Sequence, residues 1–413
     1  MKDIKGKLLV YAHYYYPDVA STGQILKELC EGMKNDFDIT VICAVPSYNG
    51  KVESEYRTYK YYHENINGVN IVRVRVPAFT KGNKISRMKN LISYFFGAVG
   101  ATFKSEKQDY IFTISQPPIL GGVLGVIGKW FKGGKMIYNI QDFNPEQTMT
   151  VGYSENKLIL KTAMAVDKFS CRQADKVIVV GRDMQETLRN RFNNKNVPDN
   201  IFINNWIDEK EIYPLPENNE RVIAFKKQYG LENKIVIMYS GNIGLYYDLD
   251  NLIKVIGRFK TRDDVVFAFV GDGTKKQDIE DYVKKHELKN VQFIPYQDKE
   301  DLIYSLNAGD VHWVVNAKGI KGVSVPSKLY GVMAVGKTVF GILEEGSEAR
   351  LIIEDCNCGI CIEPSNYELV YQELMNVIDN IDRYKNMGII GKEYIDKYIK
   401  KDVAIEKYIR EII

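Results

Sequence analysis

The stretch Ile235-Val-Ile-Met-Tyr-Ser-Gly-Asn-Ile-Gly244 decides how the second half of the chain folds. Its apolar run from Ile235 to Tyr239 predicts a buried strand, and its glycines predict a tight turn before a helix that begins near Asp248. Glycine has no Cβ atom, so the backbone of such a turn can approach an anion closely. The same residues also suit a plain strand–turn–helix joint of an α/β core.

A second stretch, Val325-Pro-Ser-Lys-Leu-Tyr-Gly-Val-Met-Ala-Val-Gly-Lys337, predicts a helix opened by proline. Proline suits the first turn of a helix, because the missing N–H has no partner there in any case. The N–H groups of Ser327, Lys328 and Leu329 should then point outward with the positive end of the helix dipole behind them. Lys328 adds a full charge, so both stretches suit a diphosphate, although an ordinary helix start explains this one as well.

The composition is that of a globular protein without a nucleic-acid partner. The chain has 413 residues, a net charge of +3, 45% hydrophobic and 26% charged residues. This length suits two domains of about 200 residues each, and so small a charge argues against nucleic acid. The charged start Met1-Lys-Asp-Ile-Lys-Gly-Lys7 lacks the apolar run of a signal peptide, and no later stretch is long enough to span a membrane. We expect a cytoplasmic protein.

No set of residues points clearly to a metal. The six cysteines are scattered except for Cys356-Asn-Cys-Gly-Ile-Cys361, which lacks a second cluster to complete four ligands. An Asp-x-Asp pair stands at Asp248-Leu-Asp250, where an acidic first helical turn is ordinary capping. We therefore expect no metal and no other cofactor.

Apolar runs alternate with longer helical segments along the whole chain. The expected strands are 8–12, 39–43, 69–74, 110–114, 136–140 and 177–180 in the first half, and 235–239, 265–269, 291–294, 311–315, 338–342 and 359–362 in the second. A polar, proline-bearing stretch, 205–220, separates the two series. The pattern predicts an α/β protein of two doubly wound, Rossmann-like domains, 1–207 and 208–396, facing a cleft, with ligands at the carboxyl ends of the strands. A nicotinamide enzyme is disfavoured, because no Gly-x-Gly-x-x-Gly follows the first strand.

Several motifs in order resemble family 4 of the retaining glycosyltransferases, which have the two-lobed GT-B fold. Within it, the chain is similar to the bacterial branch that builds O-antigen and capsule, often described as similar to fucosaminyltransferases. The motifs are His13-Tyr-Tyr-Tyr-Pro-Asp-Val-Ala-Ser-Thr-Gly23, Gln141-Asp-Phe-Asn-Pro-Glu146, Asn205-Trp-Ile-Asp208, the turn at 241–244, Phe269-Val-Gly-Asp-Gly273, Pro326-Ser-Lys328 and Ser347-Glu-Ala-Arg350. The resemblance implies retention of anomeric configuration and a terminal helix, 397–413, that returns to the first domain.

We expect the second domain to bind the donor, a nucleotide-diphosphate sugar. The predicted donor-binding residues are Gly241, Asn242, Ile243, Gly244, Gly271, Gly273, Ser324, Pro326, Ser327, Lys328 and Glu348. Lys328 is the predicted catalytic cation for the departing diphosphate. The resemblance usually brings two glutamates to positions that here hold Val323 and Gly331, and an Arg and a Lys near the glycine turn, where here no basic residue stands. Glu348 is our candidate for the missing ribose contact, with a dipole-favoured glutamate at a helix start as the alternative.

We expect the first domain to hold the acceptor. Asp142 and Glu146 follow the strand 136–140 and are predicted catalytic carboxylates, Asp142 orienting the acceptor hydroxyl and taking its proton, unless the pair only caps a turn. Ser21, Thr22 and Gly23 open the first helix and form a second anion or acceptor site. His13 is a possible base on the acceptor side, or a satisfied core histidine.

The segment from Phe79 to Ser105 suggests where the acceptor lies. It contains no acid; its basic residues are Lys81, Lys84, Arg87, Lys89 and Lys104, and its apolar residues include Leu91, Ile92, Tyr94, Phe95 and Phe96. A basic, aromatic amphipathic helix suits an anionic membrane surface, whereas a core helix with a solvated basic face is the alternative.

Together these features predict a metal-independent, retaining transfer of a hexosyl or N-acetylhexosaminyl group. The donor is expected to be UDP-linked, and the acceptor a polyprenyl-diphosphate-linked or growing glycan of a bacterial surface polysaccharide, at the inner face of the cell membrane. A nucleotide-sugar 2-epimerase of similar fold is the alternative enzyme, and a non-catalytic binding protein is a third reading.

Overall fold

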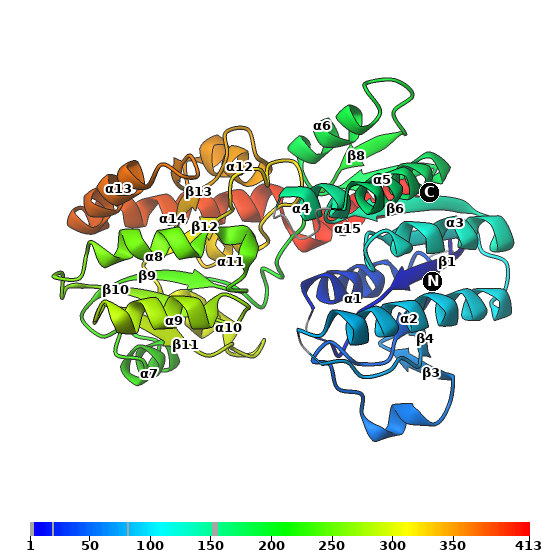
Figure 1. The fold of residues 1–413 in the computed structure, drawn as a ribbon, viewed down its shortest axis with the longest axis horizontal. Helices are drawn as coiled ribbons and strands as arrows, with labels where there is room; N and C mark the ends of the chain where they lie inside the picture. Colours follow the sequence, from blue (N-terminus) through cyan, green and yellow to red (C-terminus); the bar gives the residue numbers. More distant parts are fainter. Residues whose placement is uncertain (1–3, 19, 81, 151–155) are drawn as a thin grey trace. The chain divides into compact units, whose positions relative to one another are not determined.

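The computed structural model describes residues 4–18, 20–80, 82–150 and 156–413. The chain divides into two compact units, the first made of residues 1–204 and 402–413 and the second of residues 205–401 (Figure 1). Each unit has its own sheet, covered by helices on both faces (Figure 1). The predicted α/β class with two doubly wound domains is confirmed.

The first unit contains an eight-stranded sheet in the order β3-β4-β2-β1-β5-β6-β7-β8. Its strands are β1 (Lys7–Ala12), β2 (Asp38–Ala44), β3 (Tyr61–Ile66), β4 (Val69–Val74), β5 (Tyr110–Ile114), β6 (Lys135–Ile140), β7 (Lys176–Val179) and β8 (Asn200–Phe202). All neighbours are parallel except β3 and β4, which form an antiparallel hairpin. The two strands absent from our expectation, β3 and β8, lie at the edges of the sheet, where half-exposed residues give no continuous apolar run.

The helices of the first unit cross between these strands. They are α1 (Ser21–Met33), η1 (Ser54–Arg57), α2 (Lys84–Lys104), α3 (Leu120–Lys132), α4 (Asn144–Thr150), α5 (Lys157–Gln173), α6 (Arg182–Arg191) and α15 (Lys401–Ile412). The last helix packs on this unit through Tyr408, whose hydroxyl accepts a hydrogen bond from Asn139 Nδ2 at 3.0 Å. The chain therefore returns to its first unit after residue 401.

The second unit contains a six-stranded, fully parallel sheet in the order β11-β10-β9-β12-β13-β14. The strands are β9 (Ile235–Ser240), β10 (Val265–Val270), β11 (Val291–Ile294), β12 (Val311–Val315), β13 (Thr338–Ile342) and β14 (Gly359–Ile362). Its helices are α7 (Glu220–Gln228), η2 (Leu245–Tyr247), α8 (Leu249–Gly257), α9 (Lys276–Lys285), α10 (Leu302–Ala308), α11 (Lys328–Ala334), α12 (Glu348–Cys356), α13 (Tyr367–Asp379) and α14 (Ile381–Tyr398). Every residue of β10 and β12 is buried, as expected for parallel strands covered on both faces.

Candidate active site

In the second unit, the turns after β9 and β10 pack backbone against backbone. Gly241 N donates to Val270 O at 2.9 Å, and Ile243 N donates to Asp272 O at 2.9 Å. A Cβ atom on Gly271 would lie 2.1 Å from Gly241 O, and one on Gly273 would lie 2.2 Å from Ile243 O. Only glycine fits at 271 and 273. The turns at 241–244 and 271–273 therefore pack tightly together at the carboxyl ends of β9 and β10, and they are here called the glycine joint.

Lys328, the first residue of α11, lies directly against this joint. A Cβ atom on Gly241 would lie 2.7 Å from Lys328 Cε, so the glycine leaves room for the lysine side chain. The Lys328 ammonium lies over two aromatic rings, 3.6 Å from the ring centre of Tyr247 and 5.0 Å from that of Tyr239. Lys328 has no ion-pair partner among the residues that the structure describes.

The surroundings of Lys328 disfavour its charge. Although part of the side chain reaches solvent, burial among protein atoms lowers the pKa of Lys328 from 10.5 to about 7. The two tyrosine rings contribute partial negative charge but no counter-ion. A ligand with two phosphates would supply the missing negative charge.

The helix start beside Lys328 differs in one detail from our expectation. Leu329 N donates to Pro326 O at 3.2 Å, so the prediction that the Leu329 N–H stays free was wrong. The first turn is tightened into an i→i+3 pattern, which satisfies this donor within the helix. Ser327 is exposed and Ser324 is half-buried.

Two acidic positions of the second unit have partners of their own. Asp248 accepts hydrogen bonds from Tyr367 Oη at 2.6 Å and Asn251 Nδ2 at 2.7 Å, and Asp250 forms an ion pair with Lys275 at 2.8 Å.

Glu348 begins α12 and is only 1% exposed. In the same motif, Arg350 contacts Glu354 and Glu363 at 2.7 and 3.0 Å. The motif at 347–350 thus anchors the start of α12, and the ribose contact of Glu348 stays a prediction.

In the first unit, three neighbouring strands end beside the predicted acceptor residues. β1 leads to His13, β5 to Ser115 and β6 to Asp142. Ser115 Oγ accepts from the backbone N–H groups of Gln141 at 3.1 Å and Asp142 at 3.3 Å, which fixes the turn that carries Asp142. Ser115 was not among the predicted acceptor-side residues, although it directly follows a predicted strand.

Asp142 is a half-buried carboxylate, with no hydrogen-bond or ion-pair partner for its side chain in the described part of the chain. Burial raises the pKa of Asp142 from 3.8 to about 6. A carboxylate near this pKa can exchange a proton close to neutral pH. Asp142 therefore has the environment of a general base.

Glu146 has a different environment. Both of its carboxylate oxygens accept from Arg191 at 2.5 Å, and Arg191 also contacts the buried Asp167 at 2.6 Å. Tyr138 Oη donates to Asp167 at 2.7 Å, and the Arg191 guanidinium lies 4.1 Å from the Phe143 ring centre. This network joins α4, α5 and α6 and holds the Glu146 carboxylate in an ion pair. The catalytic role of Glu146 stays a prediction.

His13 is buried and neutral. Its Nε2 lies 3.1 Å from Asn90 Oδ1, and Asn90 Nδ2 donates to Pro77 O at 2.8 Å, which turns the Asn90 oxygen toward the ring. Nε2 must therefore be the donor. Burial lowers the pKa of His13 to about 4. The satisfied-histidine alternative fits this geometry better than a base that uses Nε2.

The start of α1 carries the remaining predicted acceptor residues. Ser21 is exposed, and Thr22 Oγ1 donates to Gln116 Oε1 at 2.9 Å. A Cβ atom on Gly23 would lie 3.0 Å from Tyr14 O, so a glycine lets the helix approach the chain after β1. The hydrogen bond between Thr22 and Gln116 thus connects the start of α1 to the segment that follows β5.

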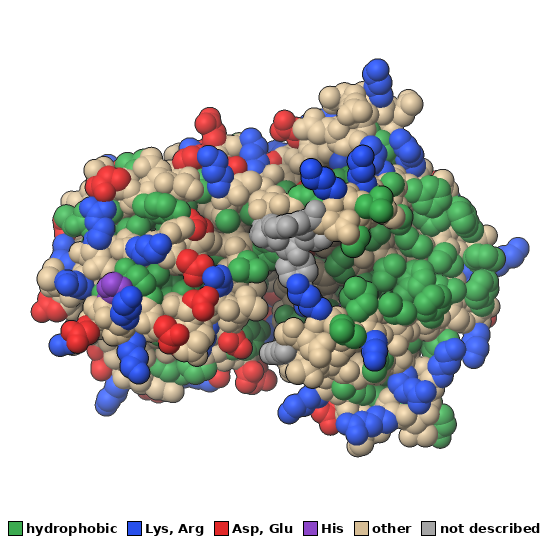
Figure 2. Space-filling view, in the orientation of Figure 1, with side chains coloured by type: hydrophobic (Ala, Val, Ile, Leu, Met, Phe, Trp, Pro, Cys, Tyr) green, Lys and Arg blue, Asp and Glu red, His purple; other side chains and the backbone are tan. Residues whose placement is uncertain are grey.

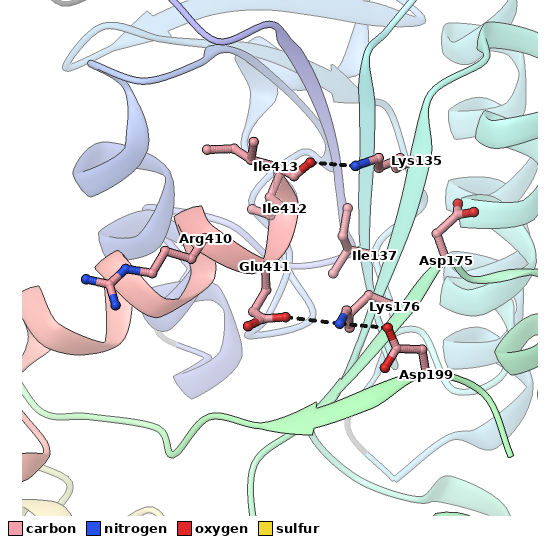
Figure 3. A pocket seen from close by; sticks show the side chains of 9 residues that line it. All are labelled: Lys135, Ile137, Asp175, Lys176, Asp199, Arg410, Glu411, Ile412 and Ile413. Atoms are coloured by element: carbon pink, nitrogen blue, oxygen red, sulfur yellow. Dashed lines mark hydrogen bonds and ion pairs between the residues drawn. The ribbon is translucent and has the colours of Figure 1, made fainter.

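A pocket of about 320 Å³ lies at the end of the first unit's sheet where β6 and β7 begin, opposite the carboxyl ends of these strands (Figure 3). Lys135 contacts the backbone oxygen of Ile413 at 2.5 Å. Lys176 forms ion pairs with Asp199 at 2.7 Å and Glu411 at 3.2 Å (Figure 3). These contacts hold α15 on the unit, so we assign this pocket no part in the candidate site.

Cysteines and acids do not assemble a metal centre in the part of the chain that the structure describes. Cys356 and Cys358 are buried free thiols, and Cys361 is half-buried.

Comparisons with known families match each unit separately. Residues 22–200 match the glycosyl transferase 4-like domain, and residues 221–394 match the glycosyl transferases group 1. The chain is 25% identical to the probable glycosyltransferase WbjE of Pseudomonas aeruginosa, over 81% of this chain and 82% of that protein. It is also 25% identical to the putative colanic acid biosynthesis glycosyl transferase WcaI of Escherichia coli K12, over 98% and 99% of the two chains.

Solved structures share the fold. Sucrose-phosphate synthase of Thermosynechococcus elongatus superimposes with a TM-score of 0.75 at 14% identity, over 98% of both chains. Anabaena HepE, solved in complex with UDP-glucose, gives a TM-score of 0.70 at 13% identity, also over 98% of both chains. The predicted GT-B fold is confirmed.

Proposed function

Because this chain is a glycosyltransferase, we propose that it moves a sugar, with retention, from a UDP-linked donor to a lipid-linked or growing glycan of a bacterial surface polysaccharide. The relative WcaI is named for colanic acid biosynthesis, and HepE is a fold relative solved with UDP-glucose, which supports both parts of the proposal. The observation that carries it is the position of Lys328: among the described residues it has no counter-ion, and it lies beside turns that only glycine can form. The 2-epimerase alternative has no support, because both matched domains are glycosyltransferase domains.

In the proposed reaction, the second unit stabilises the departing diphosphate. The Lys328 ammonium and the backbone of the glycine joint face the charge that develops as the bond between sugar and phosphate breaks. These groups belong to the chain itself, and Asp248 and Asp250 already have partners. We therefore propose that transfer needs no metal ion.

The first unit supplies Asp142, which orients the acceptor hydroxyl and accepts its proton as the new glycosidic bond forms. Double displacement would need a second carboxylate as nucleophile, and the nearby Glu146 is held by Arg191. This arrangement favours attack from the same face of the sugar that the diphosphate leaves.

We further propose that the protein works as a peripheral protein at the inner face of the cell membrane.

The test is release of free UDP from UDP-sugars, measured with and without a glycan acceptor. We expect release to depend on the acceptor, and turnover to fall by about 10²-fold or more in Lys328→Ala, because the cation acts where charge develops. Lys285→Ala, which changes an exposed lysine on α9, is the matched control. Wild-type turnover in Lys328→Ala would remove the central assignment.

A further inference from the structure

The first unit exposes many large apolar side chains on three of its helices. They are Ile85, Met88, Ile92, Phe96 and Phe103 on α2, Trp130 and Phe131 on α3, and Leu158, Ile159 and Phe169 on α5, here called the apolar face. Leu158 is 74% exposed, Ile85 72% and Phe96 67%. Figure 2 shows apolar side chains gathered on the part of the first unit where Figure 1 labels α2, α3 and α5.

Ring contacts join the three helices at the surface. The Phe103 ring on α2 lies 4.7 Å from that of Phe131 on α3. The Trp130 ring on α3 lies 6.1 Å from that of Phe169 on α5. Trp130 Nε1 also donates to Gln173 Oε1 at 3.3 Å. The three helices are therefore joined at the surface where these four aromatic rings lie, and contiguous apolar surface of this kind usually marks an interaction site.

The same three helices are strongly basic. They carry ten basic residues, namely Lys84, Arg87, Lys89, Lys104, Lys129, Lys132, Lys157, Lys161, Lys168 and Arg172, and one acid, Asp167. Asp167 is buried and paired with Arg191, so it contributes no negative charge to the surface. The whole chain, in contrast, has 56 basic and 53 acidic residues. Lys81, which we also counted in the basic segment, lies outside the described residues.

We propose that the apolar face inserts into the surface of an anionic bilayer. Basic side chains beside exposed aromatic and aliphatic ones complement acidic lipid headgroups and the acyl boundary beneath them. Among the described residues, no helix is long and apolar enough to cross a bilayer. The proposal rests on the proposed function only in that a lipid-linked acceptor requires the enzyme at this surface; it adds α3 and α5, and contact with acyl chains, to the electrostatic attraction expected from α2 alone.

The chain contains its own reporter for this contact. Its three tryptophans are Trp130, which is 60% exposed, and Trp206 and Trp313, which are each 4% exposed. We expect vesicles that contain phosphatidylglycerol to shift Trp130 emission to shorter wavelength, and lipids brominated on the acyl chain to quench it. Trp130→Phe should remove most of both effects, because the other two tryptophans are shielded already.

Two sets of substitutions separate insertion from charge attraction. Ile85, Met88 and Phe96 replaced together by Gln should lower the vesicle partition coefficient by about 30-fold or more, since three largely exposed apolar side chains no longer enter the bilayer. Lys84, Arg87 and Lys89 replaced by Gln should lower it by about fivefold per residue at low salt, with less effect at high salt. The matched controls are Ile389 and Ile390 replaced by Gln on α14, and Lys284, Lys285 and Lys289 replaced by Gln, all exposed in the second unit.

Three outcomes would overturn the proposal: no Trp130 response to anionic vesicles, unchanged binding in the apolar triple variant, or a stable dimer in solution that covers Trp130. Binding of UDP and transfer to a short soluble acceptor are measured on the same variants. Both should stay normal, because the substituted side chains are exposed, whereas the α2 residue that contacts His13 is the buried Asn90. A wild-type protein that transfers sugar but does not bind anionic vesicles would refute the membrane face alone. A wild-type protein that binds the vesicles but transfers no sugar would refute the proposed function alone.

Discussion

Protonation of Lys328 should make nucleotide binding depend on pH. In the free protein, burial lowers the pKa of Lys328 to about 7, so at pH 8 only about one tenth of the molecules carry the ammonium. A bound diphosphate favours the charged form and raises this pKa again. The complex therefore holds more protons than the free protein above pH 7, and affinity must fall as pH rises.

The size of this pH dependence follows from the fraction of free protein molecules in which Lys328 is charged. If only the charged form binds the diphosphate well, the apparent Kd of UDP rises by about 15-fold between pH 7 and pH 8.5. The nucleotide itself adds little to this slope, because a terminal phosphate with a pKa near 6 is already ionised at pH 7. Isothermal titration calorimetry at pH 8, in buffers of different ionisation enthalpy, should record uptake of nearly one proton for each UDP bound.

Lys328→Met keeps much of the side-chain volume and removes the proton site. We expect this variant to bind UDP weakly with no pH dependence and no proton uptake, whereas Lys285→Met should behave as wild type. The reasoning is refuted if wild-type affinity stays constant from pH 7 to pH 8.5, or if Lys328→Met retains the slope. The first result would mean that Lys328 is fully charged before the ligand arrives, and the second that another group titrates.

Three further predictions concern the rest of the candidate site. Asp142→Asn should lower the rate of transfer by about 10²-fold or more with UDP binding intact. In the wild type, kcat/KM should fall as pH drops through about 6, where the Asp142 base gains its proton. Normal transfer in the variant would assign Asp142 to capping instead. Activity should survive EDTA, and a loss that Mn²⁺ or Mg²⁺ restores would make Asp248 and Asp250 candidate ligands. Arg191→Met should lower the free energy of unfolding of the first unit by about 3–5 kcal/mol in chemical denaturation, because Glu146 and Asp167 lose their partner. Substitution of the exposed Arg189 on the same helix by Met should change this free energy little. Equal stability of the two variants would contradict the structural role of Glu146.

The sequence predicted what depends on neighbours along the chain. Runs such as 265–269 and 311–315 are almost wholly apolar, and they form buried inner strands of a parallel sheet. β3 was not predicted, because its residues are half-buried or exposed and form no continuous apolar run. A signal for it was nevertheless present, since Asn67-Gly68 between β3 and β4 is a typical hairpin turn, with φ of 52° and 90°.

Contacts between distant segments could not be predicted in this way. Nothing near Glu146 indicates that Arg191 will occupy its carboxylate, because that pairing depends on how α6 packs against α4 and α5. The rings that surround Lys328 likewise come from β9 and η2, far from α11 in the sequence. The continuity of the apolar face depends on the packing of three helices, whereas the sequence marked only the first of them.

Within the described part of the chain, Lys328 and Asp142 differ from other shielded charges because neither side chain has an ion-pair partner. Two buried arginines have partners within the fold: Arg73 contacts Glu64 at 2.8 Å, and Arg191 contacts two carboxylates. The pKa values of Lys328 and Asp142 move toward neutrality, and burial rather than a counter-charge is the cause in both cases. A fold gains no stability from holding a lysine and a carboxylate where their charged forms are disfavoured, so such positions indicate groups kept for a ligand or a reaction. Each unit supplies one of them, a cation suited to a leaving diphosphate in the second and a base suited to a hydroxyl in the first, which is the division of labour that glycosyl transfer requires.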